Sequence, residues 1–213
     1  MEFLARTVVL IIERQDLVVL CLFQHIRISL IAISLIVLVG VPLGLLIGRY
    51  RFFAQPVIYV TGILYTIPVL ALFGFLIPFF GIGDRPTFFA LFIYGLLPVV
   101  RNTYVGITTV DDAVLEAARG MGCTEMQLLT KIRLPLAMPV IISGIRTITV
   151  MTISIATIAA FIGAGGLGVL IFRGITTYNT ELTFAGSLLV AGLALGADGV
   201  LAILEKQLLK RTR

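Results

Sequence analysis

Long stretches without a single charged residue most constrain how this chain can fold. No Asp, Glu, Lys or Arg occurs between Arg27 and Arg49, and a second uncharged stretch runs from Phe52 to Gly83. A bilayer core about 30 Å thick is crossed by roughly 20 helical residues, and a helix satisfies its own backbone polar groups there. Apolar residues make up 59% of the chain and charged residues only 13%, against about 25% charged residues in soluble domains. We therefore expect an all-α membrane protein.

The remaining apolar stretches predict five transmembrane helices in one membrane domain, residues 25–205. The spans are expected at about residues 28–48, 57–79, 88–105, 138–162 and 182–204. Pro68 is expected to kink the second span. Residues 1–24 carry charges at 13–16 that would be costly in hydrocarbon, so an interfacial amphipathic segment is expected there. Residues 206–213 form a basic tail.

The distribution of basic residues predicts the orientation of these spans. An odd number of spans puts the termini on opposite sides, and the basic tail places the C-terminus inside and the N-terminus outside. The loops assigned to the inside hold Arg49, Arg51, Arg101, Arg119, Lys131 and Arg133. The loops assigned to the outside hold Arg85 and Arg173, with Arg6, Arg14 and Arg27 ahead of the first span. This asymmetry agrees with the positive-inside rule and predicts a multi-pass cell-membrane protein with a cytoplasmic 108–135 loop.

The 108–135 loop is the one long polar stretch, and its sequence predicts two short helices. Asp111 suits the N-cap of a first helix over 113–119, and Gly122 follows as a stop signal. Thr124–Gln127 fits a capping box that starts a second helix. Such a protrusion suits a groove on a partner protein, with Glu116 offering a charge for orientation. The alternative is a solvated hairpin that merely links two spans.

The spacing of residues in this loop carries a family resemblance. Glu116, Ala117 and Ala118, then Gly122, then the 132–135 stretch resemble the EAA loop of permease subunits of bacterial binding-protein-dependent ABC importers. The resemblance implies the type I importer permease fold and a loop that docks on a cytoplasmic ATPase. The implied docking residues are Glu116, Ala117, Ala118, Gly122, Ile132, Leu134 and Pro135.

The resemblance also implies the partners. These are a cytoplasmic ABC ATPase dimer that binds ATP and Mg, a second permease copy or sister permease, and an extracellular substrate-binding protein. This chain is then no enzyme and binds no cofactor of its own. Residues 64–83, 95–107 and 160–175 resemble the osmoprotectant branch, which is associated with glycine betaine, carnitine and choline.

Other functions remain as alternatives at this point. One is an ABC permease for another small solute such as methionine, since methionine-type permeases share the five-span plan. An ion-coupled secondary transporter is another, although the paired broken repeats typical of that class are not seen. An intramembrane enzyme would need a nucleophile with a base, which the sequence does not offer, so no catalytic residue is assigned. The basic residues sit at membrane flanks, which argues against a nucleic-acid partner.

Arg101 lies near the inner end of the third predicted span, and two further charges fall inside spans. Arg146 lies in the fourth span and Asp198 in the fifth. Charges within membranes usually face the bundle interior and pair, so we hypothesise an ion pair between these residues. The alternative is that one or both side chains reach the inner interface.

Glycines mark two further features. Residues 163–168 match the G-x-G-x-x-G pattern but end an apolar span with no βαβ unit, so a break near the translocation path is favoured over nucleotide binding. Candidate path or gate residues are Phe161, Gly163, Gly165 and Gly166. Glycines at 40, 44 and 48 predict close helix packing, within the subunit rather than at a dimer seam. His25 is the only histidine, so no metal site is expected, and an interfacial anchor is favoured.

Overall fold

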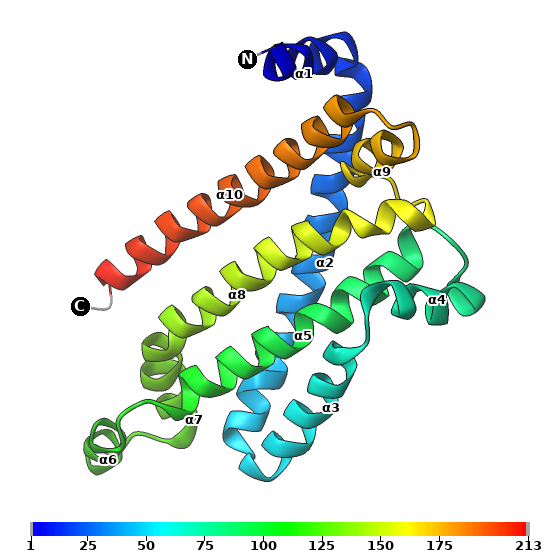
Figure 1. The fold of residues 1–213 in the computed structure, drawn as a ribbon. Helices are drawn as coiled ribbons and strands as arrows, with labels where there is room; N and C mark the ends of the chain where they lie inside the picture. Colours follow the sequence, from blue (N-terminus) through cyan, green and yellow to red (C-terminus); the bar gives the residue numbers. More distant parts are fainter. Residues whose placement is uncertain (1, 212–213) are drawn as a thin grey trace.

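The structure, a computed structural model, describes residues 2–211, which are almost entirely helical (Figure 1). Of the predicted basic tail, residues 212 and 213 lie outside the described residues. The longer helices are α1 (Glu2–Glu13), α2 (Gln15–Arg49), α3 (Ala54–Thr66), α4 (Val69–Phe80), α5 (Asp84–Thr108), α8 (Leu134–Ala156) and α10 (Thr180–Arg211). The shorter helices are η1 (Arg51–Phe53), α6 (Asp112–Gly120), α7 (Glu125–Gln127), the π-helical η2 (Leu128–Arg133), the 3₁₀-helical η3 (Ile158–Ile162) and α9 (Gly168–Thr176).

Four helical segments within the described residues are each long and apolar enough to cross a membrane. A bent pair, Arg51–Thr66 with Val69–Phe80, makes up to five spans if it is counted as one. Its two halves meet at 95°, where the sequence predicted a kinked single span. The bend follows from Pro68, which has no N–H and disfavours helical backbone at Ile67; Ile67 is extended, with ψ of 124°. The Tyr94 hydroxyl donates a hydrogen bond to the carbonyl that Ile67 exposes at the break.

The first long helix begins earlier than the predicted span. α1 ends at Glu13 and α2 starts at Gln15, so residues 15–24 of the predicted interfacial segment belong to α2 instead. Asp16 lies in the first turn of α2, where a negative charge is favoured by the helix dipole. Arg27 forms an ion pair of 2.5 Å with Asp84 at the start of α5. The helix dipole therefore stabilises the charge of Asp16, and the ion pair with Asp84 stabilises the charge of Arg27.

The predicted glycine stripe packs inside the subunit, as expected. α2 crosses α5 so closely that a Cβ on Gly44 would lie 2.5 Å from the Thr103 Cβ and 2.9 Å from the Val100 carbonyl oxygen. Gly40 and Gly48 also face α5, at Val99 and Ile107 respectively. Small residues let helix backbones approach in this way where no hydrophobic effect drives association.

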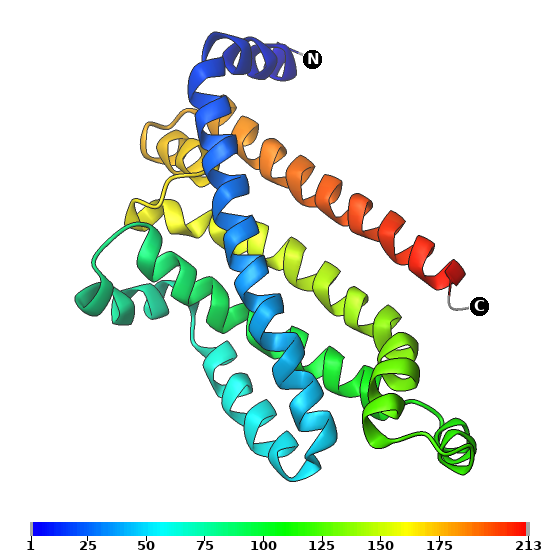
Figure 2. The ribbon, with the colours of Figure 1, turned by 180° about the vertical axis from the view of Figure 1, so that it is seen from behind.

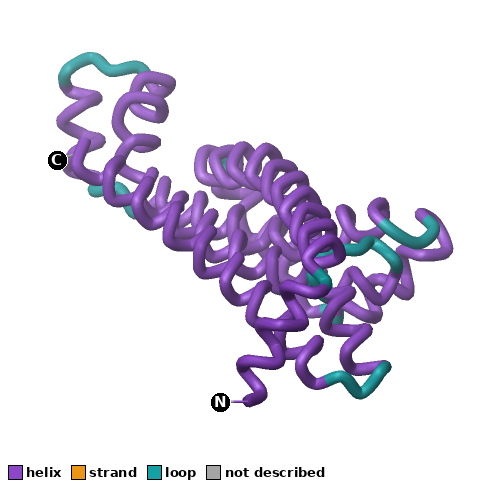
Figure 3. Tube along the Cα trace, turned by 90° about the horizontal axis from the view of Figure 1, so that it is seen from above, coloured by secondary structure: helices purple, strands orange, loops and turns teal. Residues whose placement is uncertain are grey.

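The long helices define two ends of the molecule. α5, α8 and α10 run side by side, and α2 crosses behind them (Figures 1 and 2). The α6–α7 segment projects from the end where α5 finishes and α8 begins, while α1 lies across the other end (Figure 1). Viewed from above, the α6–α7 segment again stands apart from the bundle (Figure 3). The 108–135 loop is thus a protrusion rather than a covered connection.

Candidate functional site

The 108–135 loop is built by local backbone rules. The Asp111 carboxylate accepts a hydrogen bond of 2.9 Å from the Ala113 N–H and so caps α6. After α6 the backbone forms a Schellman motif, in which the Cys123 N–H donates to Ala118 and the Gly122 N–H donates to Arg119. This motif needs a left-handed residue, and Gly122 supplies it with φ of +85°. Thr124 and Gln127 then form a reciprocal capping box that starts α7.

A small apolar core fixes the angle between the two helices of the loop. Leu115, Ala118 and Leu128 are buried against one another, with Cys123 and Ile132 packed beside them. An ion pair of 3.0 Å between Arg119 and Glu125 also bridges the glycine turn, although both side chains are exposed and such pairs contribute little. The loop is therefore a preformed unit rather than a flexible link.

The predicted docking residues divide into two groups in the structure. Glu116, Ala117 and Gly122 are exposed on the protrusion. Ala118 is only 2% exposed and packs on Leu128, so its small size serves packing within the loop. The remaining three, Ile132, Leu134 and Pro135, are partly buried and join the loop to α8. The first group is the most accessible to a partner surface.

Exposed apolar residues flank that first group, and the sequence reasoning missed them. Met121 is 78% exposed, Met126 62% and Val114 43%. Methionine side chains adapt to irregular surfaces and are favoured where binding requires such fit. The signal lay in the sequence, because both methionines sit within the one long polar stretch of the chain. The π-helical η2 that follows is a geometry that is often found at functional sites.

The candidate gate residues lie around the break between η3 and α9. Gly163, Gly165 and Gly166 all have φ near +80°, which side-chain-bearing residues rarely adopt. Phe161 is 54% exposed and packs against Phe172, with ring centroids 4.2 Å apart. The break therefore presents an aromatic side chain beside a turn that only glycine allows.

His25 fixes this break to the bundle, so its expected role as an interfacial anchor is wrong. The side chain is fully buried. Its Nδ1 accepts a hydrogen bond of 3.2 Å from the Leu167 N–H, which places the proton on Nε2, 3.0 Å from the Ile153 carbonyl oxygen. The neighbouring Gln24 accepts a hydrogen bond of 3.0 Å from the Gly166 N–H. One turn of α2 thus satisfies the backbone of the glycine-rich turn.

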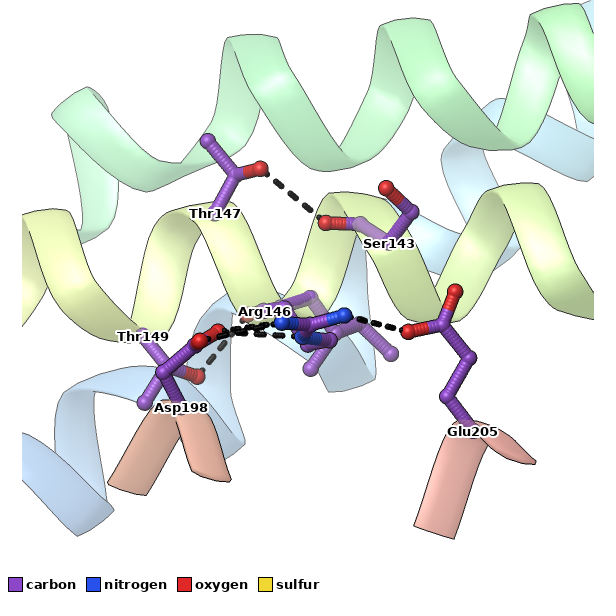
Figure 4. A network of polar contacts seen from close by, with 7 residues as sticks. Ser143, Arg146, Thr147, Thr149, Asp198 and Glu205 are labelled. Carbon is purple, nitrogen blue, oxygen red and sulfur yellow. Dashed lines mark hydrogen bonds and ion pairs between the residues drawn. The ribbon is translucent and has the colours of Figure 1, made fainter. Parts of the chain in front are cut away.

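Arg146 and Asp198 meet between α8 and α10 (Figure 4). The Nε and Nη2 atoms of Arg146 donate to the two carboxylate oxygens of Asp198 at 3.0 and 2.9 Å. A third group, Glu205, accepts from Nη1 at 2.5 Å. Glu205 was not predicted, although its spacing of seven residues from Asp198 puts both carboxylates on one face of a helix. We call these three residues the charged triad.

The charged triad holds a part of α10 that has little else to hold it. Of the described side chains from residue 195 to 207, none is buried. Replacing Arg146 with Gln leaves two carboxylates without their shared cation, which is strongly destabilising in a partly desolvated setting. We expect the thermal unfolding midpoint of the detergent-purified protein to fall by several degrees. Asp198→Asn should cost less, because Arg146 keeps Glu205; an equal midpoint for Arg146→Gln and wild type would contradict the role.

Across the described residues, no cluster of three or more His, Cys, Asp or Glu side chains is arranged to hold a metal ion. The polar groups that converge are the charged triad and the contacts at the glycine-rich turn. Their chemistry is that of hydrogen bonding and charge pairing between helices.

Comparison with known proteins identifies the family of most of the chain. A family model described as "Binding-protein-dependent transport system inner membrane component" matches residues 40–210. The "Choline transport system permease protein OpuBB" of Bacillus subtilis is 46% identical over 186 residues, covering 87% of this chain and 86% of the relative. The "Glycine betaine/carnitine/choline transport system permease protein OpuCB" of the same organism is 44% identical, covering 86% and 85%.

A solved structure gives the same fold at lower identity. An inward-facing form of the MetNI methionine ABC transporter matches with a TM-score of 0.82 and 20% identity, covering 91% of this chain and 97% of that one. At this identity the match shows the shared fold alone.

Proposed function

The chain belongs to the family of binding-protein-dependent transport system inner membrane components, and from this we propose that it is the permease subunit of an ATP-driven importer of quaternary ammonium solutes. It is a multi-pass inner-membrane protein with the type I importer permease fold. The single observation that carries the solute class is an identity of 44–46% with permeases named for choline, carnitine and glycine betaine, over 86–87% of the chain. Methionine rests on a likeness of 20%, which does not extend beyond the fold. Family membership also argues against an ion-coupled secondary transporter.

We assign the energy source to separate subunits. In this proposal a cytoplasmic ATPase dimer binds ATP and Mg, and the protruding 108–135 loop docks into it through Glu116, Ala117 and the exposed methionines. The preformed packing of the loop supports this, because a rigid protrusion transmits motion to α5 and α8, between which it lies. This chain binds no cofactor of its own and does no chemistry.

The remaining partners follow from the same proposal. An extracellular substrate-binding protein delivers the solute, and a second permease, identical or related, completes the path. The charge asymmetry supports an N-terminus outside and a C-terminus inside, with the 108–135 loop in the cytoplasm. Phe161 and the glycine-rich turn lie at the opposite end from the loop (Figure 1), and this position supports the proposal that they gate the outer side of the path.

The test is solute uptake by vesicles that contain the permease, its ATPase and its binding protein. We expect ATP-dependent accumulation of glycine betaine, carnitine or choline, and none of methionine. Uptake that persists without ATP but follows an imposed ion gradient would overturn the ATP-driven mechanism. Accumulation of methionine alone would overturn the solute class.

A further inference from the structure

A groove with both polar and apolar lining lies between α3 and α5, away from the 108–135 loop, the glycine-rich turn and the charged triad. It is an open groove with a volume of about 840 Å³. Its polar lining comes from Gln55 and Tyr59 on α3 and from Arg101 and Tyr104 on α5. The residues between them, including Pro56 and Val105, are apolar.

The groove opens on the side of α5 that faces away from α2. Val99, Thr103 and Ile107 on the opposite side of α5 are buried, and they face the glycines of α2. Arg101 and Val105 are exposed. The α2 side of α5 is thus closed by packing, and the groove side is exposed.

Among the described side chains, Arg101 has no partner of opposite charge. None of the acidic side chains among residues 2–207 forms an ion pair with it. It lies seven residues before the end of α5, about 10 Å along the helix. Arg101 lies near the inner end of the third predicted span, and charged residues in spans usually face an interior or a water-filled path and mark the passage of a substrate.

The lining of the groove combines two kinds of recognition. A guanidinium binds a carboxylate through two parallel hydrogen bonds. Aromatic faces attract a quaternary ammonium group, which has no N–H to donate. Arg101 and Tyr104 are three residues apart on one helix face, with Cβ atoms about 5–6 Å from each other. Tyr59 and Gln55 form the facing wall, one turn apart on α3.

We propose that this groove is a weak binding site on the translocation path for a zwitterionic quaternary ammonium solute, with Arg101 holding the carboxylate and Tyr59 and Tyr104 facing the ammonium group. This rests on the proposed function and sharpens its substrate class. Glycine betaine and carnitine carry both groups. Choline carries only the ammonium, so it gains nothing from Arg101 and is opposed by its charge.

The test is direct binding to the permease–ATPase complex in nanodiscs, measured by calorimetric titration. Glycine betaine is compared with tetramethylammonium, a probe that lacks the carboxylate. The wild type should bind glycine betaine more tightly, and Arg101→Gln should weaken glycine betaine binding about tenfold while leaving tetramethylammonium unchanged or slightly tighter. Arg101→Lys should bind glycine betaine more tightly than Arg101→Gln but less tightly than the wild type. The lysine ammonium supplies the positive charge but cannot form the two parallel hydrogen bonds of a guanidinium.

Matched variants separate the groove from general effects. Arg173→Gln removes another exposed cation, on α9, and should leave both affinities unchanged. Tyr59→Leu should weaken both probes, whereas Tyr59→Phe should keep most of the binding. Retained tetramethylammonium binding shows that Arg101→Gln is folded.

Three results would overturn the assignment. They are equal affinities of the wild type for the two probes, an equal loss of both in Arg101→Gln, and an effect of Arg101→Gln seen only in nanodiscs that contain anionic lipid. The last result would mean that Arg101 binds a lipid phosphate. Failure of the proposed function is distinct, because it shows as absent ATP-dependent uptake by the wild type in vesicles.

Discussion

Replacing Gly122 with Val is expected to reduce ATP-dependent uptake by about 5–30-fold while the membrane-spanning part stays folded. Gly122 holds φ of +85° at the end of α6, and left-handed backbone costs other residues roughly 1–2 kcal/mol, with β-branched residues among the worst. An energy of that size changes a population by about 5–30-fold. The loop would then leave the geometry that presents Glu116 and the methionines to the ATPase.

Gly120 supplies the matched control for this substitution. It lies two residues earlier, ends α6, and has nothing within 4 Å of an added Cβ. Gly120→Ala should therefore leave uptake near the wild-type rate. Co-purification of the permease with its ATPase is the second measurement, and Gly122→Val should lose it. Normal uptake and normal co-purification by Gly122→Val would show that the angle of the loop does not matter for coupling.

The helix caps of this loop could be predicted from sequence, but the direction of its side chains could not. Asp111, Gly122 and the Thr124–Gln127 box act through residues no more than five positions away, so their roles can be deduced from spacing alone. Whether Ala118 points outward or inward depends on where Leu128 lies after the turn, ten residues later. The family motif indicates that a small residue is required at position 118, but not whether that residue contacts a partner or packs within the loop.

Contacts between distant segments account for the other differences. Charge-free stretches located the spans because hydrocarbon imposes the same demand on every residue. The sequence predicted an interfacial role for His25 because this residue lies at the edge of an apolar stretch. Its buried role depends on the Leu167 N–H, 142 positions away, which no local pattern reveals. Pro68 marked the bend in the second span, but the 95° angle depends on the packing of α4 against α5.

The glycine-rich turn gives the largest expected effect on folding, through Gly168. A Cβ at Gly168, the first residue of α9, would overlap the Thr157 carbonyl oxygen and lie 2.7 Å from the Thr157 carbonyl carbon. Overpacking typically costs roughly 1–3 kcal/mol, and a backbone carbonyl cannot rotate away as a side chain can, so Gly168→Ala should reach the upper end. For a chain of this length, that corresponds to a fall of about 6–12 °C in the unfolding midpoint.

The same substitution tests whether α9 must sit tightly on the end of α8 for the outer side of the path to form. Gly192→Ala on α10 is the control, because nothing lies within 4 Å of its Cβ and alanine favours a helix over glycine by about 1 kcal/mol. Its unfolding midpoint should stay level or rise. If Gly168→Ala unfolds at the wild-type temperature, α9 does not approach Thr157 as described. If its midpoint falls while Gly192→Ala is unaffected, the close approach, rather than glycine content in general, sets the stability of the break.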